Sequence, residues 1–141
     1  MRLKDVMTDE VIAVEPDASV LEVALIMKKE NIGSVPICEG TDVVGMITDR
    51  DIVLRVVCEK KDPEKVKCRE VMTERLVVGK PQMNVETALE LMGDAQVRRL
   101  PVVEEGHLVG FITLGALAVN DYFRDESGEA LAEISTPNRS W

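Results

Sequence analysis

The residues with the clearest chemical capacity are Thr48 and Asp51, which stand where an apolar run ends and a helical pattern begins. An ionised carboxylate only accepts hydrogen bonds, so Asp51 suits a ligand that presents two neighbouring hydroxyl groups, and Thr48 could add a hydroxyl contact. The free N–H groups of a helix start also attract anions such as phosphate. The same spacing describes a capping box, in which Thr48 and Asp51 satisfy the helix's own N–H groups. The two interpretations are compatible, because a carboxylate has acceptor sites for both.

The segment around Thr48 occurs twice in the chain. Val6-Met7-Thr8 returns as Val71-Met72-Thr73, a shift of 65 residues, and the same shift carries Pro36 onto Pro101. A fixed offset of this kind marks an internal duplication. We therefore predict repeat one over residues 4–60, a charged linker over 61–68, repeat two over 69–125 and a flexible C-terminal tail over 126–141.

Both repeats have the hydrophobic pattern of the order β-α-β-β-α. A short apolar strand precedes a helix that is capped by Ser19 in repeat one and by Asn84 in repeat two. Two apolar runs separated by a glycine-containing turn then predict a hairpin, and a second helix closes the unit. The predicted strands are 11–14, 34–39 and 42–48 in repeat one, and 76–78, 99–104 and 107–113 in repeat two.

The closing helices carry more apolar residues than one buried face can hold. Repeat one has Ile52, Val53, Leu54, Val56 and Val57 there, and repeat two has Leu117, Ala118, Val119, Tyr122 and Phe123. An apolar surface of this size is unusual on a monomer. We expect at least a homodimer.

Composition excludes several classes of function. The chain has 141 residues, of which 45% are hydrophobic and 30% charged, with a net charge of −9. That charge repels nucleic acid, and no apolar run is long enough for a membrane span or a signal peptide, so we expect a cytoplasmic protein. The three cysteines are widely spaced and lack a histidine cluster, which argues against a disulfide framework or a metal site.

The β-α-β-β-α order, Val35-Pro36-Ile37, and Gly45-Met46-Ile47-Thr48-Asp49-Arg50-Asp51 with their shifted copies resemble the cystathionine-β-synthase-type (CBS) motif. The duplication resembles a CBS pair. This resemblance implies an α+β fold in which two small sheets pack as a pseudo-symmetric pair, leaving two clefts. Members of the family commonly bind AMP, ADP, ATP, S-adenosylmethionine or NAD-type ligands there, dimerise, and regulate an attached or partner protein.

On that resemblance the first cleft is the principal site, with Asp51 holding the ribose diol. Pro36 lacks an N–H and leaves main-chain groups for a purine edge, with apolar neighbours around the base. Repeat two has Ala116 at the carboxylate position and Arg98-Arg99 where repeat one has Gly33-Ser34, so its cleft is expected to be empty or altered in preference. The predicted ligand-binding residues are Ile12, Ala13, Val35, Pro36, Ile37, Thr48, Arg50, Asp51, Arg98 and Arg99, with a weaker second set of Val77, Pro101 and Thr113.

The predicted function is a stand-alone regulatory module that binds an adenosine-containing nucleotide, AMP or ATP foremost, and signals to an unidentified partner protein. A ligand-free dimerisation scaffold is the alternative. An enzyme is disfavoured, because the motifs assemble no nucleophile with a base, no paired catalytic carboxylates and no metal cluster.

Overall fold

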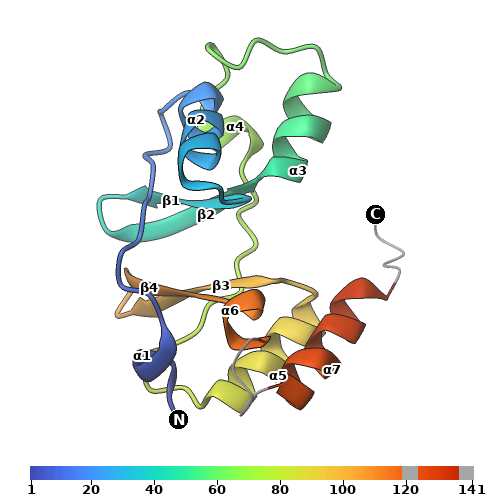
Figure 1. The fold of residues 1–141 in the computed structure, drawn as a ribbon. Helices are drawn as coiled ribbons and strands as arrows, with labels where there is room; N and C mark the ends of the chain where they lie inside the picture. The colour runs from blue at the N-terminus through green and yellow to red at the C-terminus, as the bar shows by residue number, and fades with distance from the viewer. Residues whose placement is uncertain (119–123, 137–141) are drawn as a thin grey trace. The chain divides into compact units, whose positions relative to one another are not determined.

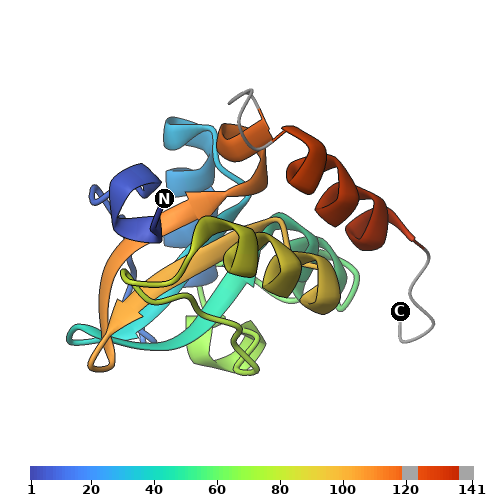
Figure 2. The ribbon, with the colours of Figure 1, turned by 90° about the horizontal axis from the view of Figure 1, so that it is seen from below.

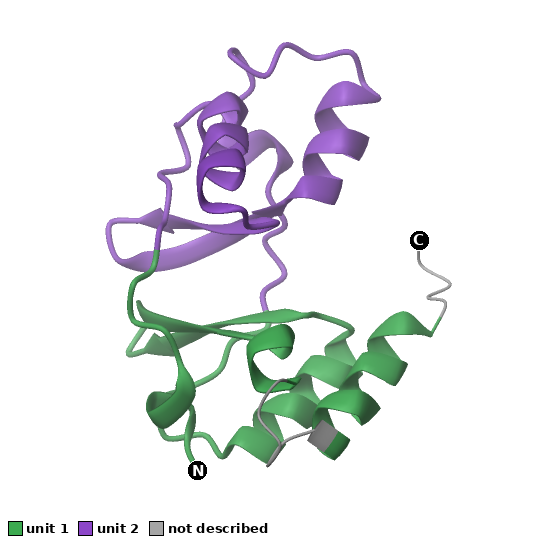
Figure 3. Cartoon of the chain, in the orientation of Figure 1, with its two compact units in different colours: residues 1–11, 77–141 green, residues 12–76 purple. Residues whose placement is uncertain are grey.

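The computed structural model describes residues 1–118 and 124–136. The chain forms two compact units, which do not follow the order of the sequence (Figure 3). Unit 1 comprises Met1–Val11 and Val77–Trp141, and unit 2 comprises Ile12–Leu76.

Unit 2 packs one long helix and a hairpin around an aliphatic core (Figure 1). Ser19 caps the start of helix α2, where its hydroxyl accepts a hydrogen bond from the Glu22 N–H at 3.3 Å, and Asn31 caps the end in the left-handed conformation. Val35, Ile37 and Ile47 are fully buried in the core. The elements are α2 (Val20–Glu30), β1 (Ser34–Glu39), β2 (Asp42–Thr48), α3 (Asp49–Ile52), the π-helix η1 (Val53–Val57) and α4 (Cys68–Val71).

Unit 1 is built in the same way around its own core. Asn84 caps helix α5 by accepting from the Glu86 N–H at 2.9 Å, and Gln96 ends that helix in the left-handed conformation. The elements are α1 (Leu3–Val6), α5 (Val85–Ala95), β3 (Arg99–Glu104), β4 (His107–Thr113), α6 (Leu114–Ala118) and α7 (Arg124–Ser135).

Most elements of the two units correspond at one fixed offset. The helices α2 and α5, the hairpins β1–β2 and β3–β4, and the short helices α1 and α4 all stand 65 residues apart. Both hairpins are antiparallel, and both have an irregularity at the same place, between Ile37 and Cys38 and between Val102 and Val103. The predicted α+β class is confirmed, and the duplication extends to the strand register.

The first residues of each repeat pack with the other repeat. Residues 1–11 belong to unit 1, which otherwise consists of repeat two and the C-terminal segment, and the start of repeat two belongs to unit 2. Leu3 is fully buried in the core of unit 1, and its N–H donates to the Met83 carbonyl at 2.9 Å. Its counterpart Cys68 is fully buried in unit 2, where its N–H donates to the Ala18 carbonyl at 2.9 Å. Each core is therefore completed by a segment from the other repeat.

The first strand predicted for repeat one is reduced to one bridging residue, Val14. The Val14 N–H donates to the Pro36 carbonyl and the Val14 carbonyl accepts from the Cys38 N–H, at 3.1 and 2.9 Å. In repeat two the bridging residue is Gly79, one position past the predicted strand 76–78, and it makes the matching pair of bonds with Pro101 and Val103. Pro16 and Pro81 follow two residues later and lack an N–H, which limits further pairing.

The structure differs from the predicted flexible tail, because α7 covers residues 124–135 as a helix beside α5 (Figures 1 and 2). Ala130 is 4% exposed in the core of unit 1, and the Gln96 side-chain amide donates to the Glu133 and Thr136 carbonyls at 3.0 and 3.2 Å. Gly93 faces α7, and a Cβ there would lie 3.4 Å from the Ala130 Cα. The buried residues of α7 include the small Ser127 and Ala130, so the segment lacks the strong apolar periodicity by which a helix is predicted.

The closing helix of repeat one exposes apolar side chains. Val53, Leu54 and Val57 are 51%, 45% and 63% exposed. In repeat two, Leu117 is buried, while Val119, Tyr122 and Phe123 lie outside the described residues. Among the described helices, none has the length and apolar character that crossing a membrane requires.

Candidate functional site

Thr48 and Asp51 lie at the end of β2, where the hairpin passes into α3. The Thr48 N–H donates to Asp51 Oδ2 at 2.9 Å, and the Asp51 N–H donates to Thr48 Oγ1 at 3.1 Å. The predicted capping box is therefore present. The Asp51 side chain is 14% exposed, and its carboxylate retains acceptor positions beyond the Thr48 bond.

Arg55 joins this pair to the opening segment of repeat two. Its Nη1 donates to the Val71 carbonyl at 2.8 Å, and its Nε lies 3.9 Å from Asp51 Oδ1. Two main-chain hydrogen bonds between Met46 and Thr73, at 2.8 and 3.0 Å, tie the same segment to β2. Thr48, Asp51 and Arg55 thus form one polar cluster with residues 71–73.

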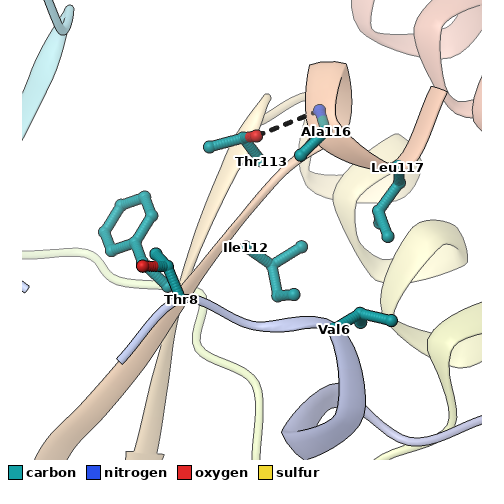
Figure 4. Close-up of a pocket in the computed structure, with 7 residues that line it drawn as sticks. Val6, Thr8, Ile112, Thr113, Ala116 and Leu117 are labelled. Atoms are coloured by element: carbon teal, nitrogen blue, oxygen red, sulfur yellow. Dashed lines mark hydrogen bonds between the residues drawn. The ribbon is translucent and has the colours of Figure 1, made fainter. Parts of the chain in front are cut away.

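The matching region of unit 1 contains a pocket of about 270 Å³ (Figure 4). The Thr8 and Phe111 main chains pair as Thr73 and Met46 do, at 2.9 and 3.0 Å. The Ala116 N–H donates to Thr113 Oγ1 at 3.1 Å, so the threonine cap is kept without a carboxylate. The lining residues are Val6, Thr8, Phe111, Ile112, Thr113, Ala116 and Leu117.

The hairpin residues predicted around Pro36 lie in different environments. Val35 and Ile37 are fully buried, and their side chains pack into the core of unit 2. The buried Pro36 pairs with Met46 across the hairpin, and its carbonyl accepts from Val14.

Among the members of the first predicted set that precede residue 60, Ile12, Ala13 and Arg50 are exposed. All three belong to unit 2. Arg50 follows Thr48 in the first turn of α3 and lies at the surface.

Arg98 and Arg99 belong to unit 1, together with the weaker set. Arg98 is exposed, and Arg99 is half-buried directly opposite Thr113 in the β3–β4 register. Val77 and Pro101 are not among the described residues that line the pocket, whereas Thr113 is.

Sequence reasoning missed Arg55 and the part of the opening segments in these sites. Val6 and Thr8 line the pocket of unit 1, and Val71 binds Arg55 in unit 2. The Val-Met-Thr motif at the start of both repeats was the available sequence signal. The boundaries of the repeats do not show, however, that each copy of the motif packs with the other repeat. Arg55 follows Asp51 by four residues, a spacing at which helical side chains can meet.

The cysteines have ordinary structural environments. Cys38 and Cys68 are buried, and Cys58 is exposed. Burial raises the pKa of the Cys68 thiol to about 11 and also raises the pKa of Cys38. Within residues 1–118 and 124–136, no group of three or more His, Cys, Asp or Glu side chains could hold a metal ion.

The duplicated α+β unit, with exchanged opening segments and a threonine cap at the end of each hairpin, defines a tandem-repeat protein with paired candidate sites. Residues 3–57 and 68–119 each match the CBS domain. The chain belongs to the CBS domain family.

Relatives and solved structures agree with this assignment. The chain is 43% identical over 136 residues to the CBS domain-containing protein YhcV of Bacillus subtilis (strain 168), covering 96% of each chain. It is similar to the CBS domain pair of protein MJ0100 in complex with 5′-methylthioadenosine and S-adenosyl-L-methionine, with a TM-score of 0.76, 25% identity and coverage of 89% of this chain and 98% of that one. A hexameric CBS-CP12 protein from bloom-forming cyanobacteria gives a TM-score of 0.75 and 25% identity, with coverage of 89% and 73%.

Proposed function

We propose that the chain is a regulatory module that binds an adenosine-containing nucleotide next to Thr48 and Asp51. The observation that carries the proposal is the Asp51 carboxylate, which is held in a fixed direction by the Thr48 N–H and keeps acceptor positions for a ligand. A ribose offers two adjacent hydroxyl donors to such a carboxylate. The module binds its ligand without transforming it.

The choice of an adenosine ligand is supported by a similar protein. The CBS domain pair of MJ0100 was solved with 5′-methylthioadenosine and S-adenosyl-L-methionine, and both of these molecules contain adenosine. AMP and ATP share that part and add phosphate. Arg50 is the cation that we assign to an anionic ligand at this site, because a protein of charge −9 attracts phosphate only through local positive charge.

The pocket of unit 1 is a second and weaker site in this proposal. It offers the Thr8 and Thr113 side chains within a largely apolar lining, but Ala116 provides no carboxylate for a diol. The two repeats therefore differ in ligand preference, and the principal site is in repeat one.

The exposed face formed by Val53, Leu54 and Val57 is the proposed surface for self-association. A ligand that binds one arrangement of the dimer more tightly than another shifts the dimer toward the first arrangement. In this proposal a partner protein responds to that shift. Val57→Asp should convert a dimer to a monomer in sedimentation measurements. Leu131→Asp, at a 43% exposed position on α7, is the control and should leave the dimer intact.

Thermal unfolding with AMP, ADP, ATP, S-adenosylmethionine, 5′-methylthioadenosine and NAD tests the ligand assignment. A ligand at a hundred times its Kd adds about 2.7 kcal/mol to the free energy of unfolding. We expect a rise in Tm with at least one of them, and a smaller rise in Asp51→Ala. No rise with any compound, or an equal rise in Asp51→Ala, would show that this site is wrongly assigned.

A ligand-free scaffold is the second candidate. Its supporting observation is that Thr48 and Asp51 already satisfy each other, as a purely structural cap requires. A stable oligomer whose Tm ignores all six compounds would favour the scaffold.

A further inference from the structure

Ser34 is a buried hydroxyl without a hydrogen-bond partner in the described part of the chain. Its residue is 6% exposed, and its Oγ is inaccessible to solvent. Leaving such a group unpaired costs free energy, so an unpaired buried hydroxyl calls for an explanation.

The strand register places Ser34 directly opposite Thr48. Side chains of residues that face each other across an antiparallel pair project from the same face of the hairpin, with Cβ atoms about 4.5–5.5 Å apart. The neighbouring pair, Val35 and Ile47, faces the core of unit 2, and successive side chains alternate between faces. Ser34 and Thr48 therefore share the face away from that core, at the end of the hairpin where Asp51 is held.

The second repeat changes this position together with the carboxylate. The residue opposite Thr113 is Arg99, and the residue that matches Asp51 is Ala116. Repeat one thus combines two hydroxyls with a carboxylate, whereas repeat two combines one hydroxyl with a cation. Both positions lie at the same end of their hairpin, so the two differences change the polar groups that one ligand would meet there.

We propose that Ser34 is a specificity-determining residue of the Thr48–Asp51 site, where its hydroxyl binds the ribose of the ligand. This inference rests on the proposed function. The bound ribose supplies the partner that Ser34 lacks in the free protein, so the hydroxyl costs stability without ligand and adds affinity with it. A ligand with a 2′- or 3′-hydroxyl is favoured over its deoxy analogue.

Ser34→Ala gives a test with two opposite readouts. Without ligand, the variant should unfold at the same or a higher urea concentration than the wild type, because an unpaired buried hydroxyl has been removed. With ligand, its affinity for adenosine should fall about fivefold to tenfold, as expected for one hydrogen bond. Its affinity for 2′,3′-dideoxyadenosine should stay within about twofold of the wild-type value, a change well below that of one hydrogen bond.

Ser127→Ala is the matched control. Ser127 is 1% exposed, its hydroxyl also has no partner among the described residues, and it lies in α7 of unit 1. This variant should keep the wild-type affinity for adenosine.

The outcomes separate the inference from the proposed function. If the wild type binds none of the adenosine compounds, both fail. If the wild type binds adenosine and Asp51→Asn weakens it while Ser34→Ala does not, only the role of Ser34 is refuted. A Ser34→Ala variant that loses stability and binds both nucleosides equally less well has lost a structural residue, which also refutes the role.

Discussion

Thr48 and Asp51 are bonded in both directions, with the main-chain N–H of each residue donating to the side chain of the other at 2.9 and 3.1 Å. This reciprocal pair fixes the carboxylate at the point where β2 becomes α3. A group that is already oriented loses little freedom when a ligand binds, so the cap prepares the site for binding.

Asp51→Asn should weaken nucleotide binding by about tenfold to a hundredfold. The substitution keeps the shape of the side chain but removes its charge, and charge-assisted hydrogen bonds contribute about 1.5–3 kcal/mol. Titration calorimetry with the nucleotide that raises the Tm most would measure the loss. Unchanged affinity would assign Asp51 to the helix cap alone.

Arg55→Gln should loosen the segment that Arg55 holds. Its Nη1 bond to the Val71 carbonyl at 2.8 Å is lost, so the nearby Thr73 N–H, which donates to Met46, should exchange with solvent about fivefold faster. Residue-resolved hydrogen exchange supplies its own control, because the Thr8 N–H makes the matching bond to Phe111 in unit 1. Equal acceleration at Thr8 and Thr73 would contradict a local role for Arg55.

The sequence predicted the duplication, the two hairpins and the helices α2 and α5, because each depends on local patterns. Ser19 and Asn84 mark the helix starts, and alternating apolar residues mark the strands. Thr48 and Asp51 were found for the same reason, since a capping box is read from four consecutive residues.

Contacts between distant segments could not be predicted from those patterns. Leu3 packs beside α5 and Cys68 beside α2, although each stands in the opening segment of the other repeat. Gln96 binds the carbonyls of Glu133 and Thr136, about forty residues away, and no local rule indicates such a bond. The unpaired hydroxyl of Ser34 also becomes visible only when burial is known.

Leu3→Ala tests the exchange of opening segments. Removing a fully buried leucine side chain should cost about 2–5 kcal/mol of stability. The loss should appear in unit 1, so amides of β4 should exchange faster while amides of β2 do not. Leu25→Ala, at a 54% exposed position in α2, should change stability by less than about 0.5 kcal/mol. Faster exchange in β2 alone would contradict the assignment of residues 1–11 to unit 1.

Cys68 gives a prediction for alkaline pH. Burial raises its thiol pKa from the ordinary value of 9.0 to about 11. Between these two pH values the unfolded chain has lost the proton that the folded chain keeps, so the free energy of unfolding falls as pH rises. The stabilising contribution is complete below pH 9 and disappears as pH approaches 11. Urea unfolding from pH 8 to 11 should show a smaller fall in Cys68→Ala than in the wild type, and identical curves would contradict the shift.

Ala116→Asp should give unit 1 the carboxylate that distinguishes the principal site. The Ala116 N–H already donates to Thr113 Oγ1 at 3.1 Å, as the Asp51 N–H does to Thr48, so the new side chain can complete the same capping box. The cap should stabilise the fold by about 0.5–1 kcal/mol.

The new carboxylate also adds an acceptor for a diol beside the existing pocket of about 270 Å³. Calorimetry should therefore show one additional adenosine bound per chain in Ala116→Asp, and it should persist when Asp51→Asn is combined with it. Ala116→Asn is the control, because it offers a similar cap without the charge. An additional site in both variants would mean that the shape of the pocket, rather than the carboxylate, limits binding in repeat two.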